Sequence, residues 1–222
     1  MARSAKKQTR DPDATQLRIL AAAKHEFAKF GLGGARVDRI ATRAKSNKRM
    51  LYHYFGNKEA LFRRTLEDAY GKFRAAEAAL MIERDDPVTA LKRLVGFTWD
   101  YYIDNREFIT LVNSENLHKA KHIKASAAMD DLNRPFVTRM ETLLRRGAKE
   151  NLFRPDLDAV QVLITLSGVG FHYLTNQFTG EIVYARSLMT PEARAQRLDF
   201  NINTILRLVC TAQTLTRIEE KV

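Results

Sequence analysis

The sequence predicts an all-α protein, with an N-terminal three-helix helix-turn-helix domain followed by a larger helical domain and about nine helices in total. Apolar residues recur at helical spacing along most of the 222 residues, and few segments alternate as a strand does. The first 66 residues carry 16 Lys and Arg against 5 Asp and Glu, whereas the other 156 carry 21 of each. The formal net charge of +11 therefore lies in the first third of the chain, which indicates a basic head and a neutral body.

The first helix of the head has recognisable boundary residues. Residues 1–10 are polar and basic, and we expect them to form a flexible arm. Asp11 offers an N-cap carboxylate and Pro12 suits the first helical position. Gly31 should end this helix.

Two short helices and one long helix are predicted next. An apolar stripe within residues 37–44 predicts a helix of about two turns, and the stripe of Met50, Leu51, Tyr54 and Phe55 predicts another. Asn57 then caps a helix whose pattern persists to about Ile82. Two short helices joined by a tight break are typical of a helix-turn-helix, and we expect the DNA-binding domain to span residues 11–57.

The exposed side chains of the second short helix suit DNA recognition. A helix-turn-helix places this helix in the major groove, where residues near its N-terminus reach base edges. Asparagine pairs with adenine, lysine and arginine pair with guanine, and tyrosine or histidine contacts phosphate. Lys58, at the positive end of the following helix, predicts a phosphate clamp, and Arg36 is a second candidate. The residues that occupy the outward positions are Asn47, Lys48, Arg49, Tyr52 and His53.

The segment from Thr15 to Leu61 resembles the N-terminal domain of the TetR family of bacterial transcriptional regulators, above all in the string Leu51-Tyr-His-Tyr-Phe-Gly-Asn-Lys-Glu-Ala-Leu61. The resemblance implies a homodimeric repressor that binds an inverted-repeat operator and responds to a small molecule. It implies that Asn47, Lys48, Arg49 and His53 face base edges, and that Tyr52, Tyr54 and Lys58 hold phosphates. With the two flanking cations, the predicted DNA-binding residues are Arg36, Lys45, Asn47, Lys48, Arg49, Tyr52, His53, Tyr54 and Lys58.

The turn departs from the family pattern. The family usually has Ala-Gly-Val-Ser, with glycine in the left-handed conformation, where this chain has Ala44-Lys-Ser-Asn47. Either Lys45 adopts a positive φ at a cost on the order of 1 kcal/mol, or the turn is rebuilt. Arg36 also replaces the usual threonine before the first of the two helices.

Residues 58–222, which include the neutral part of the chain from residue 67 onward, are predicted to bind an effector and to dimerise. Beyond the long helix we expect helices near 88–103, 105–118, 127–149, 157–178 and 191–217, and the resemblance implies that the last two pair with their twofold copies. Aromatic residues point to an apolar effector pocket, although core packing explains most of them equally well. His172, on an apolar helix, fits either a ligand anchor or a core histidine. The predicted effector-binding residues are Phe97, Trp99, Tyr101, Tyr102, Phe108, Phe136 and His172.

Metal binding and catalysis have little support in the body. Glu115, His118 and His122 fall at positions i, i+3 and i+7 of one predicted helical face, which allows a metal site, but lysines crowd them. We therefore expect no metal and no cofactor. The body has no nucleotide loop, nucleophile elbow or clustered acid pair, so we expect no enzyme activity.

The chain is expected to act in the cytoplasm, without a membrane anchor. Its longest nearly apolar stretch, 160–174, is shorter than a bilayer span, and its N-terminus has no apolar core of a secretory signal. The single cysteine, Cys210, fits a reducing compartment. Charge alone leaves two alternatives open: a membrane-surface helix and a sequence-independent architectural DNA-binding protein.

Overall fold

A computed structural model describes residues 12–220, and in this range the chain is all-α, as predicted. Contacts divide it into two compact units. The first, which we call the head, holds residues up to Ala69 together with Thr110–Ser126, and the second, the body, holds Tyr70–Ile109 and the residues from Ala127 onward. No helix in the described range is long and apolar enough to cross a membrane.

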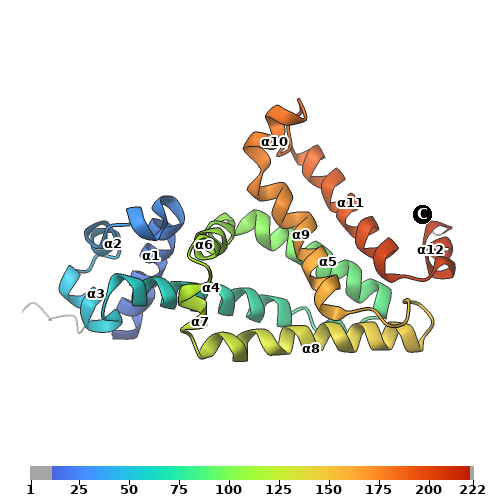
Figure 1. Cartoon of the computed structure of the whole chain (residues 1–222), viewed down its shortest axis with the longest axis horizontal. Coiled ribbons are helices and arrows are strands. Elements are labelled where there is room, and N and C mark those ends of the chain that lie inside the picture. The colour runs from blue at the N-terminus through green and yellow to red at the C-terminus, as the bar shows by residue number, and fades with distance from the viewer. Residues whose placement is uncertain (1–11, 221–222) are drawn as a thin grey trace, which may run out of the picture. The chain divides into compact units, whose positions relative to one another are not determined.

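The head consists of helices from its two chain segments (Figure 1) and has a small apolar core of its own. Phe27 and Phe62 meet edge to face at its centre, with ring centroids 5.0 Å apart, and Ile19, Ile40 and Leu51 are fully buried beside them. The helices are α1 (Pro12–Gly34), α2 (Val37–Arg43), α3 (Lys48–Phe55), the first half of α4 (Lys58–Ala78), the end of α6 (Arg106–Leu117) and α7 (Lys121–Lys124).

The first helix ends as its sequence predicts. The helical conformation of α1 breaks at Gly31, where φ is 64° and ψ is 175°. A positive φ is readily adopted only by glycine, which explains the residue found there. The predicted arm over residues 1–10 and the predicted cap at Asp11 lie outside the described residues.

The turn between α2 and α3 keeps the family's geometry without its glycine. Lys45 has a φ of 50°. Of the two possibilities that the sequence left open, Lys45 therefore adopts the positive φ and the turn is not rebuilt. The Ser46 N–H donates to the Ala41 carbonyl (3.0 Å) and the Lys45 N–H donates to the Thr42 carbonyl (3.1 Å). These are the paired bonds of a Schellman motif, which satisfy the last carbonyls of α2 and offset the strain at Lys45.

A buried carboxylate joins α1 to α2. Glu26 is 3% exposed and accepts hydrogen bonds from the Arg36 N–H (2.9 Å) and from Nε of Arg39 (2.6 Å). The Arg36 side chain does not cap α2, and Glu26 instead holds the start of the helix through the Arg36 N–H and the Arg39 side chain. Burial acts to raise the pKa of Glu26, but the bonds from Arg39 and Arg36 and the charges of Arg39 and Arg43 outweigh burial and lower it.

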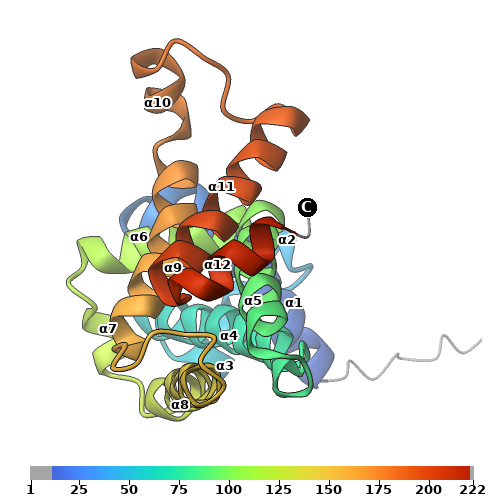
Figure 2. The same cartoon turned by 90° about the vertical axis from the view of Figure 1, so that its right-hand side faces the viewer.

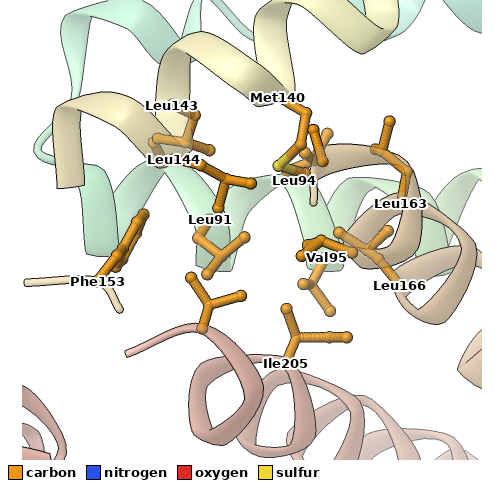
Figure 3. Packing of buried hydrophobic residues seen from close by; sticks show 14 of the residues in the cluster. Leu91, Leu94, Val95, Met140, Leu143, Leu144, Phe153, Leu163, Leu166 and Ile205 are labelled. Carbon is orange, nitrogen blue, oxygen red and sulfur yellow. The ribbon is translucent and has the colours of Figure 1, made fainter. Parts of the chain in front are cut away.

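The body packs four long helices around a continuous apolar core (Figure 3), and it also includes the second half of α4. Its central helix, α5 (Pro87–Asp104), contacts α8 (Ala128–Lys149), α9 (Ala159–Thr175) and α11 (Pro191–Val209). Leu91, Met140 and Ile205, from three of these helices, are almost completely buried at the centre.

Three helices are shorter than predicted. The α4 helix ends at Ala78 rather than near Ile82, because Met81 adopts a left-handed conformation ahead of a 3₁₀ turn, Ile82–Arg84. The predicted helix 157–178 breaks at Asn176, beyond which α10 (Gln177–Val183) begins.

The predicted helix 191–217 also breaks, after Val209. There the extended Cys210 pairs with Phe153 in an isolated bridge, and Thr211 then caps α12 (Ala212–Glu219). With α7 these additional helices make twelve in the described range instead of about nine.

Replacing Glu26 tests its role in holding α2. Glu26→Gln should lower the free energy of unfolding by about 1–2 kcal/mol at neutral pH, because glutamine loses the charge-assisted bonds to Arg39. The folded pKa of Glu26 is lowered, so its contribution is present above the unfolded value of about 4.3 and is lost as the pH falls through the folded value. Urea unfolding at pH values from 3 to 7 measures both the loss of unfolding free energy and its dependence on pH. An effect equal to that of Glu150→Gln, an exposed glutamate, or one independent of pH would contradict the assignment.

A second prediction concerns the close packing of α8. A Cβ atom on Gly147 would lie 2.1 Å from Cδ2 of the buried Phe153, whereas a Cβ on Gly96 in α5 would meet nothing within 4 Å. Gly147→Ala should therefore destabilise the body by roughly 1–3 kcal/mol. Gly96→Ala should be neutral or stabilise it by up to about 1 kcal/mol. Urea midpoints of the two variants at equal protein concentration compare them, and equal shifts would refute the packing argument.

Candidate nucleic-acid interface

The α3 helix presents its polar side chains to solvent. Leu51 is 2% exposed and anchors the helix on the head core, while Met50, Tyr54 and Phe55 are half-buried. The outward orientation predicted for five residues is confirmed, since all of them are exposed: Asn47, Lys48, Arg49, Tyr52 and His53.

Asn47 is the N-cap of α3. Its Oδ1 accepts a hydrogen bond from the Met50 N–H (2.9 Å). A bidentate contact with adenine uses the same oxygen, so Asn47 would have to give up the cap to make it. The structure thus gives Asn47 a positioning role at the start of the helix.

The two cations that follow differ in their surroundings. Nζ of Lys48 lies 3.3 Å from Oδ1 of Asp38, and both side chains are exposed, so this ion pair contributes little to stability. Arg49 is exposed and makes no hydrogen bond or ion pair with any residue between 12 and 220. Its guanidinium therefore has donors available for an incoming acceptor.

The start of α4 carries the second group of predicted contacts. The Oδ1 of Asn57 accepts from the Ala60 N–H (2.8 Å), which confirms Asn57 as the cap of this helix. Lys58 is half-buried, and its Nζ donates to the Gly33 carbonyl (3.2 Å). Its ammonium thus lies between the end of α1 and the positive end of α4, where a phosphate would be stabilised.

The remaining predicted contacts lie at the margins of α3. Arg36 and Lys45 are exposed, at the two ends of α2. The half-buried Tyr54 ring packs edge to face against His53, with centroids 5.3 Å apart. The nine predicted residues thus lie on α3 or in the segments directly around it.

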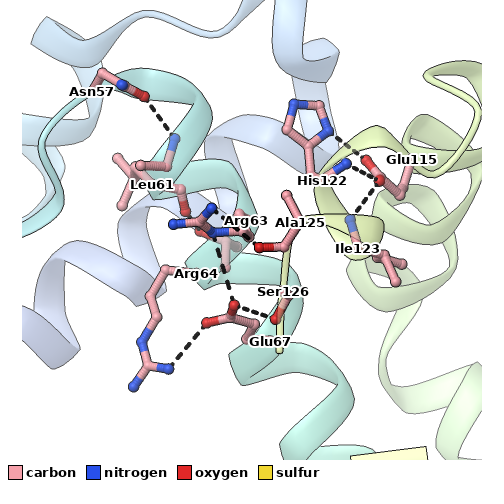
Figure 4. Close-up of polar contacts among 12 residues, drawn as sticks. Asn57, Leu61, Arg63, Arg64, Glu67, Glu115, His122, Ile123, Ala125 and Ser126 are labelled. Atoms are coloured by element: carbon pink, nitrogen blue, oxygen red, sulfur yellow. Dashed lines mark hydrogen bonds and ion pairs between the residues drawn. The ribbon is translucent and has the colours of Figure 1, made fainter. Parts of the chain in front are cut away.

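A buried Glu–His pair joins α6 to α7 in the head (Figure 4). Glu115 is 2% exposed, and its carboxylate accepts from Nδ1 of His122 (2.7 Å) and from the N–H groups of His122 (2.7 Å) and Ile123 (3.0 Å). The His122 ring meets the Phe62 ring of α4 edge to face, with centroids 5.0 Å apart. Glu115 thus fixes α7 against the helix that carries Lys58.

The predicted arrangement of Glu115, His118 and His122 on one helical face is wrong. The α6 helix ends at Leu117, and Lys119 and Ala120 adopt left-handed conformations that turn the chain. His118 is exposed and its ring contacts the Ser114 carbonyl (2.7 Å). Within the described part of the chain, no three His, Cys, Asp or Glu side chains lie together as a metal site would require.

The seven predicted effector residues lie in separate groups. Phe97, Tyr101, Tyr102 and Phe108 pack around Phe73 of α4, with centroid distances to it of 4.7–5.9 Å. These rings pack against one another between the helices, as the core-packing alternative predicts.

The other three residues lie apart from that cluster. Trp99 is buried and contacts Tyr173, with centroids 5.6 Å apart, and the Phe136 ring lies 3.5 Å from the Arg74 guanidinium. His172 is exposed, so the interpretation as a core histidine is wrong. An effector-binding role for these seven residues stays a prediction.

A buried polar network beside the aromatic cluster had no signal in the sequence. Glu77 is 3% exposed and accepts from Arg74 and Arg139, each at 2.9 Å, while Nε of Arg74 donates to Asn133 (3.2 Å). Burial lowers the pKa of Arg74, and Glu77 opposes this effect. The i, i+3 spacing of Arg74 and Glu77 was visible, but such pairs are usually solvated.

The C-terminal helices expose an apolar face. Leu163, Leu166, Ile205 and Leu206 are buried in the body core, but other apolar residues of the same segment are not. A contiguous exposed apolar surface marks an interaction site. The exposed members, with their exposed fractions, are Val160 (46%), Ile164 (59%), Phe178 (75%), Ile182 (82%), Val183 (73%) and Phe200 (60%).

Comparison with known proteins agrees with this architecture. Residues 19–65 match the family described as "Bacterial regulatory proteins, tetR family", and residues 87–205 match "Tetracyclin repressor-like, C-terminal domain". The chain is 37% identical over 195 residues to the HTH-type transcriptional repressor NicS of Pseudomonas putida, covering 88% of this chain and 92% of NicS. It is 39% identical over 108 residues to the HTH-type transcriptional repressor SCO4008 of Streptomyces coelicolor, covering 49% and 53% of the two chains.

Solved structures share the fold at low sequence identity. The fatty acid degradation regulator FadR of Bacillus halodurans superposes with a TM-score of 0.67 at 20% identity, covering 90% of this chain and 97% of FadR. The ketosteroid transcriptional regulator KstR2 of Mycobacterium tuberculosis gives 0.65 at 19% identity, covering 88% and 95%. From its helix-turn-helix head, its helical body and these matches, the chain belongs to the TetR family of bacterial transcriptional regulators.

Proposed function

We propose that this protein is a ligand-responsive repressor that binds an inverted-repeat operator as a homodimer in the cytoplasm. The observation that carries the proposal is α3: a short helix anchored by Leu51, capped by Asn47 and exposing Arg49 without a partner among the described residues. A helix of this kind, at the second position of a helix-turn-helix, reads the major groove.

The DNA contacts divide into two kinds. Lys48, Arg49 and His53 are the proposed readers of base edges, and Arg49 has the strongest support because its donors have no partner within residues 12–220. The proposed phosphate contacts surround α3 and fix its register on the duplex. They are Arg36, Lys45, Tyr52, Tyr54 and Lys58, and Asn47 adds a single contact beside its capping bond.

Dimerisation supplies the second reading head. One helix-turn-helix contacts a single half-site, whereas a twofold dimer reads two half-sites about 34–36 Å apart. The exposed apolar face of α9, with the adjoining α11, is the proposed interface, because Val160 and Ile164 are 46% and 59% exposed although they flank the body core. Pairing with a second copy would bury them.

The α4 helix is the proposed route from effector to DNA. It is continuous from Lys58 to Ala78, so the proposed phosphate clamp and the buried residues Arg74 and Glu77 lie on one helix. We propose that residues 11–57 read DNA, and that residues 58–222 bind the effector and dimerise. An effector changes operator affinity only if it binds the DNA-competent and DNA-incompetent states unequally.

Arg49 and Lys58 should affect DNA binding differently. After an operator is selected from random duplexes, Arg49→Ala should weaken operator binding about 10- to 100-fold and random-DNA binding much less, because it removes a base contact. Lys58→Ala should weaken both about equally and reduce the slope of log affinity against log salt by about one.

Fluorescence anisotropy across salt concentrations measures these effects, with Arg145→Ala, an exposed arginine of α8, as the matched control. If Arg49→Ala weakens both DNAs equally, its assignment to base reading is wrong. If the selection enriches no sequence, the protein is an architectural DNA-binding protein instead.

Ile164 tests the dimer interface. Ile164→Arg places a charge in the proposed interface and should convert the dimer into a folded monomer, with at least a tenfold loss of operator affinity. Sedimentation velocity measures whether the variant is a monomer or a dimer, and circular dichroism measures whether it is folded. Met81→Arg, at an apolar residue that is 49% exposed outside this face, should remain a dimer. A dimeric Ile164→Arg variant would exclude this part of α9 from the interface.

A further inference from the structure

An open cavity of about 510 Å³ lies within the body, where the end of α9 meets the start of α11. Figure 2 shows α10 at this end of α9, with the connection to α11 running across from it. The volume falls in the range of small-molecule sites. One of the seven predicted effector residues, His172, lines this cavity. The lining residues are His172, Tyr173, Asn176, Tyr184, Arg186, Leu188, Ala193, Gln196, Arg197 and Phe200.

The walls of the cavity are held in place by specific contacts. The Tyr173 hydroxyl donates to the Leu188 carbonyl (2.6 Å), and the Leu188 N–H donates to a carboxylate oxygen of Glu181 (2.9 Å). A Cβ atom on Gly180 would lie 2.9 Å from Cδ1 of Leu188, so α10 approaches the connection as closely as glycine permits. The cavity is therefore part of the packed structure around Leu188.

The lining is cationic and lacks an acid. Arg186 and Arg197 line the cavity beside His172, and no Asp or Glu is among its lining residues in the described part of the chain. Nη2 of Arg197 donates to the Val169 carbonyl (2.8 Å), but its Nε is buried and has no hydrogen-bond partner in the described range. Burial lowers the pKa of Arg197. Arg197 is half-buried, and its buried Nε is a donor that a bound carboxylate would satisfy.

The other lining residues are three aromatic rings, the aliphatic Leu188 and Ala193, and the amides of Asn176 and Gln196. The Arg197 guanidinium lies 5.1 Å from the Tyr173 ring centroid and 5.2 Å from that of Phe200, and Tyr184 and Leu188 complete the apolar lining. We propose that this cavity binds a small organic carboxylate with an apolar ring, its carboxylate at Arg197 and Arg186 and its ring among Tyr173, Tyr184 and Phe200. Binding of this ligand does not depend on the proposed function. Only its role as the effector rests on that proposal.

A bound ligand would be detected at Trp99. This residue is the only tryptophan in the chain, and its buried ring contacts Tyr173 with centroids 5.6 Å apart. It lies on α5, the central helix of the body core. A ligand on Tyr173 therefore changes the surroundings of a single intrinsic fluorophore.

Three small probes test the site on the full chain without DNA. Benzoate carries both the charge and the ring, benzamide has the ring without the charge, and acetate has the charge without the ring. Titration calorimetry and Trp99 fluorescence should give saturable benzoate binding at roughly millimolar affinity or tighter. Benzamide and acetate should each bind at least about tenfold more weakly. Equal affinities for benzoate and benzamide, or no benzoate binding because a second copy covers the cavity, would overturn the proposal.

Two variants locate the binding on the arginines. Arg197→Met keeps an apolar chain on the rings and should weaken benzoate at least about tenfold. Arg186→Gln changes an exposed residue and should weaken it about threefold to tenfold without affecting the fold. Arg145→Gln should bind benzoate as the natural chain does. Benzoate affinity unchanged in the two cavity variants would refute the site.

The same measurements separate this proposal from the repressor proposal. Operator affinity of Arg186→Gln without benzoate should match that of the natural chain, because the residue lies in the body. Benzoate binding that fails while operator selection succeeds removes the cavity proposal alone. Benzoate binding without any selected operator removes the repressor proposal alone.

Discussion

The presentation of the recognition helix depends on the buried carboxylate of Glu26. This side chain reaches from α1 to the N–H group of Arg36, directly before α2, and to the Arg39 side chain on α2, so it fixes α2 on the head core. The Lys45 turn then sets the direction in which α3 leaves α2. Without Glu26, α2 would lack a side-chain cap at its N-terminus, because Arg36 supplies none. One anionic group at 3% exposure thus positions the polycationic surface around it.

Much of the head could be predicted from sequence because its signals are local. Helical spacing identified Leu51 as buried and Arg49 as exposed, and Asn57 announced its own cap. The pairing of Glu26 with Arg39 joins residues 13 positions apart across a helix break, and no local pattern predicts it. The cap made by Asn47 was not predicted, although its position directly before α3 is a local signal for one, and its contact with DNA stays a prediction.

The body was harder to predict because tertiary contacts decide its details. The break after Val209 depends on Cys210, which pairs with Phe153 from a loop more than 50 residues earlier, and an apolar run contains no sign of that partner. The aromatic residues formed a strong compositional signal, but composition does not separate rings that pack on Phe73 from rings that line a cavity. The spacing of the glycines also gave no indication that Gly147 packs closely against Phe153.

Net charge describes the head well and the body poorly, for one physical reason. In the head the cations are exposed, so their sum determines the field that a polyanion meets. In the body equal numbers of acids and bases give no net charge, yet Arg74 is paired with Glu77, whereas the buried Nε of Arg197 has no partner among residues 12–220. Electrostatic energy in a desolvated site depends on the nearest groups and not on the total, because water no longer screens them. A neutral body therefore holds a site with a strong preference for anions, which its composition conceals.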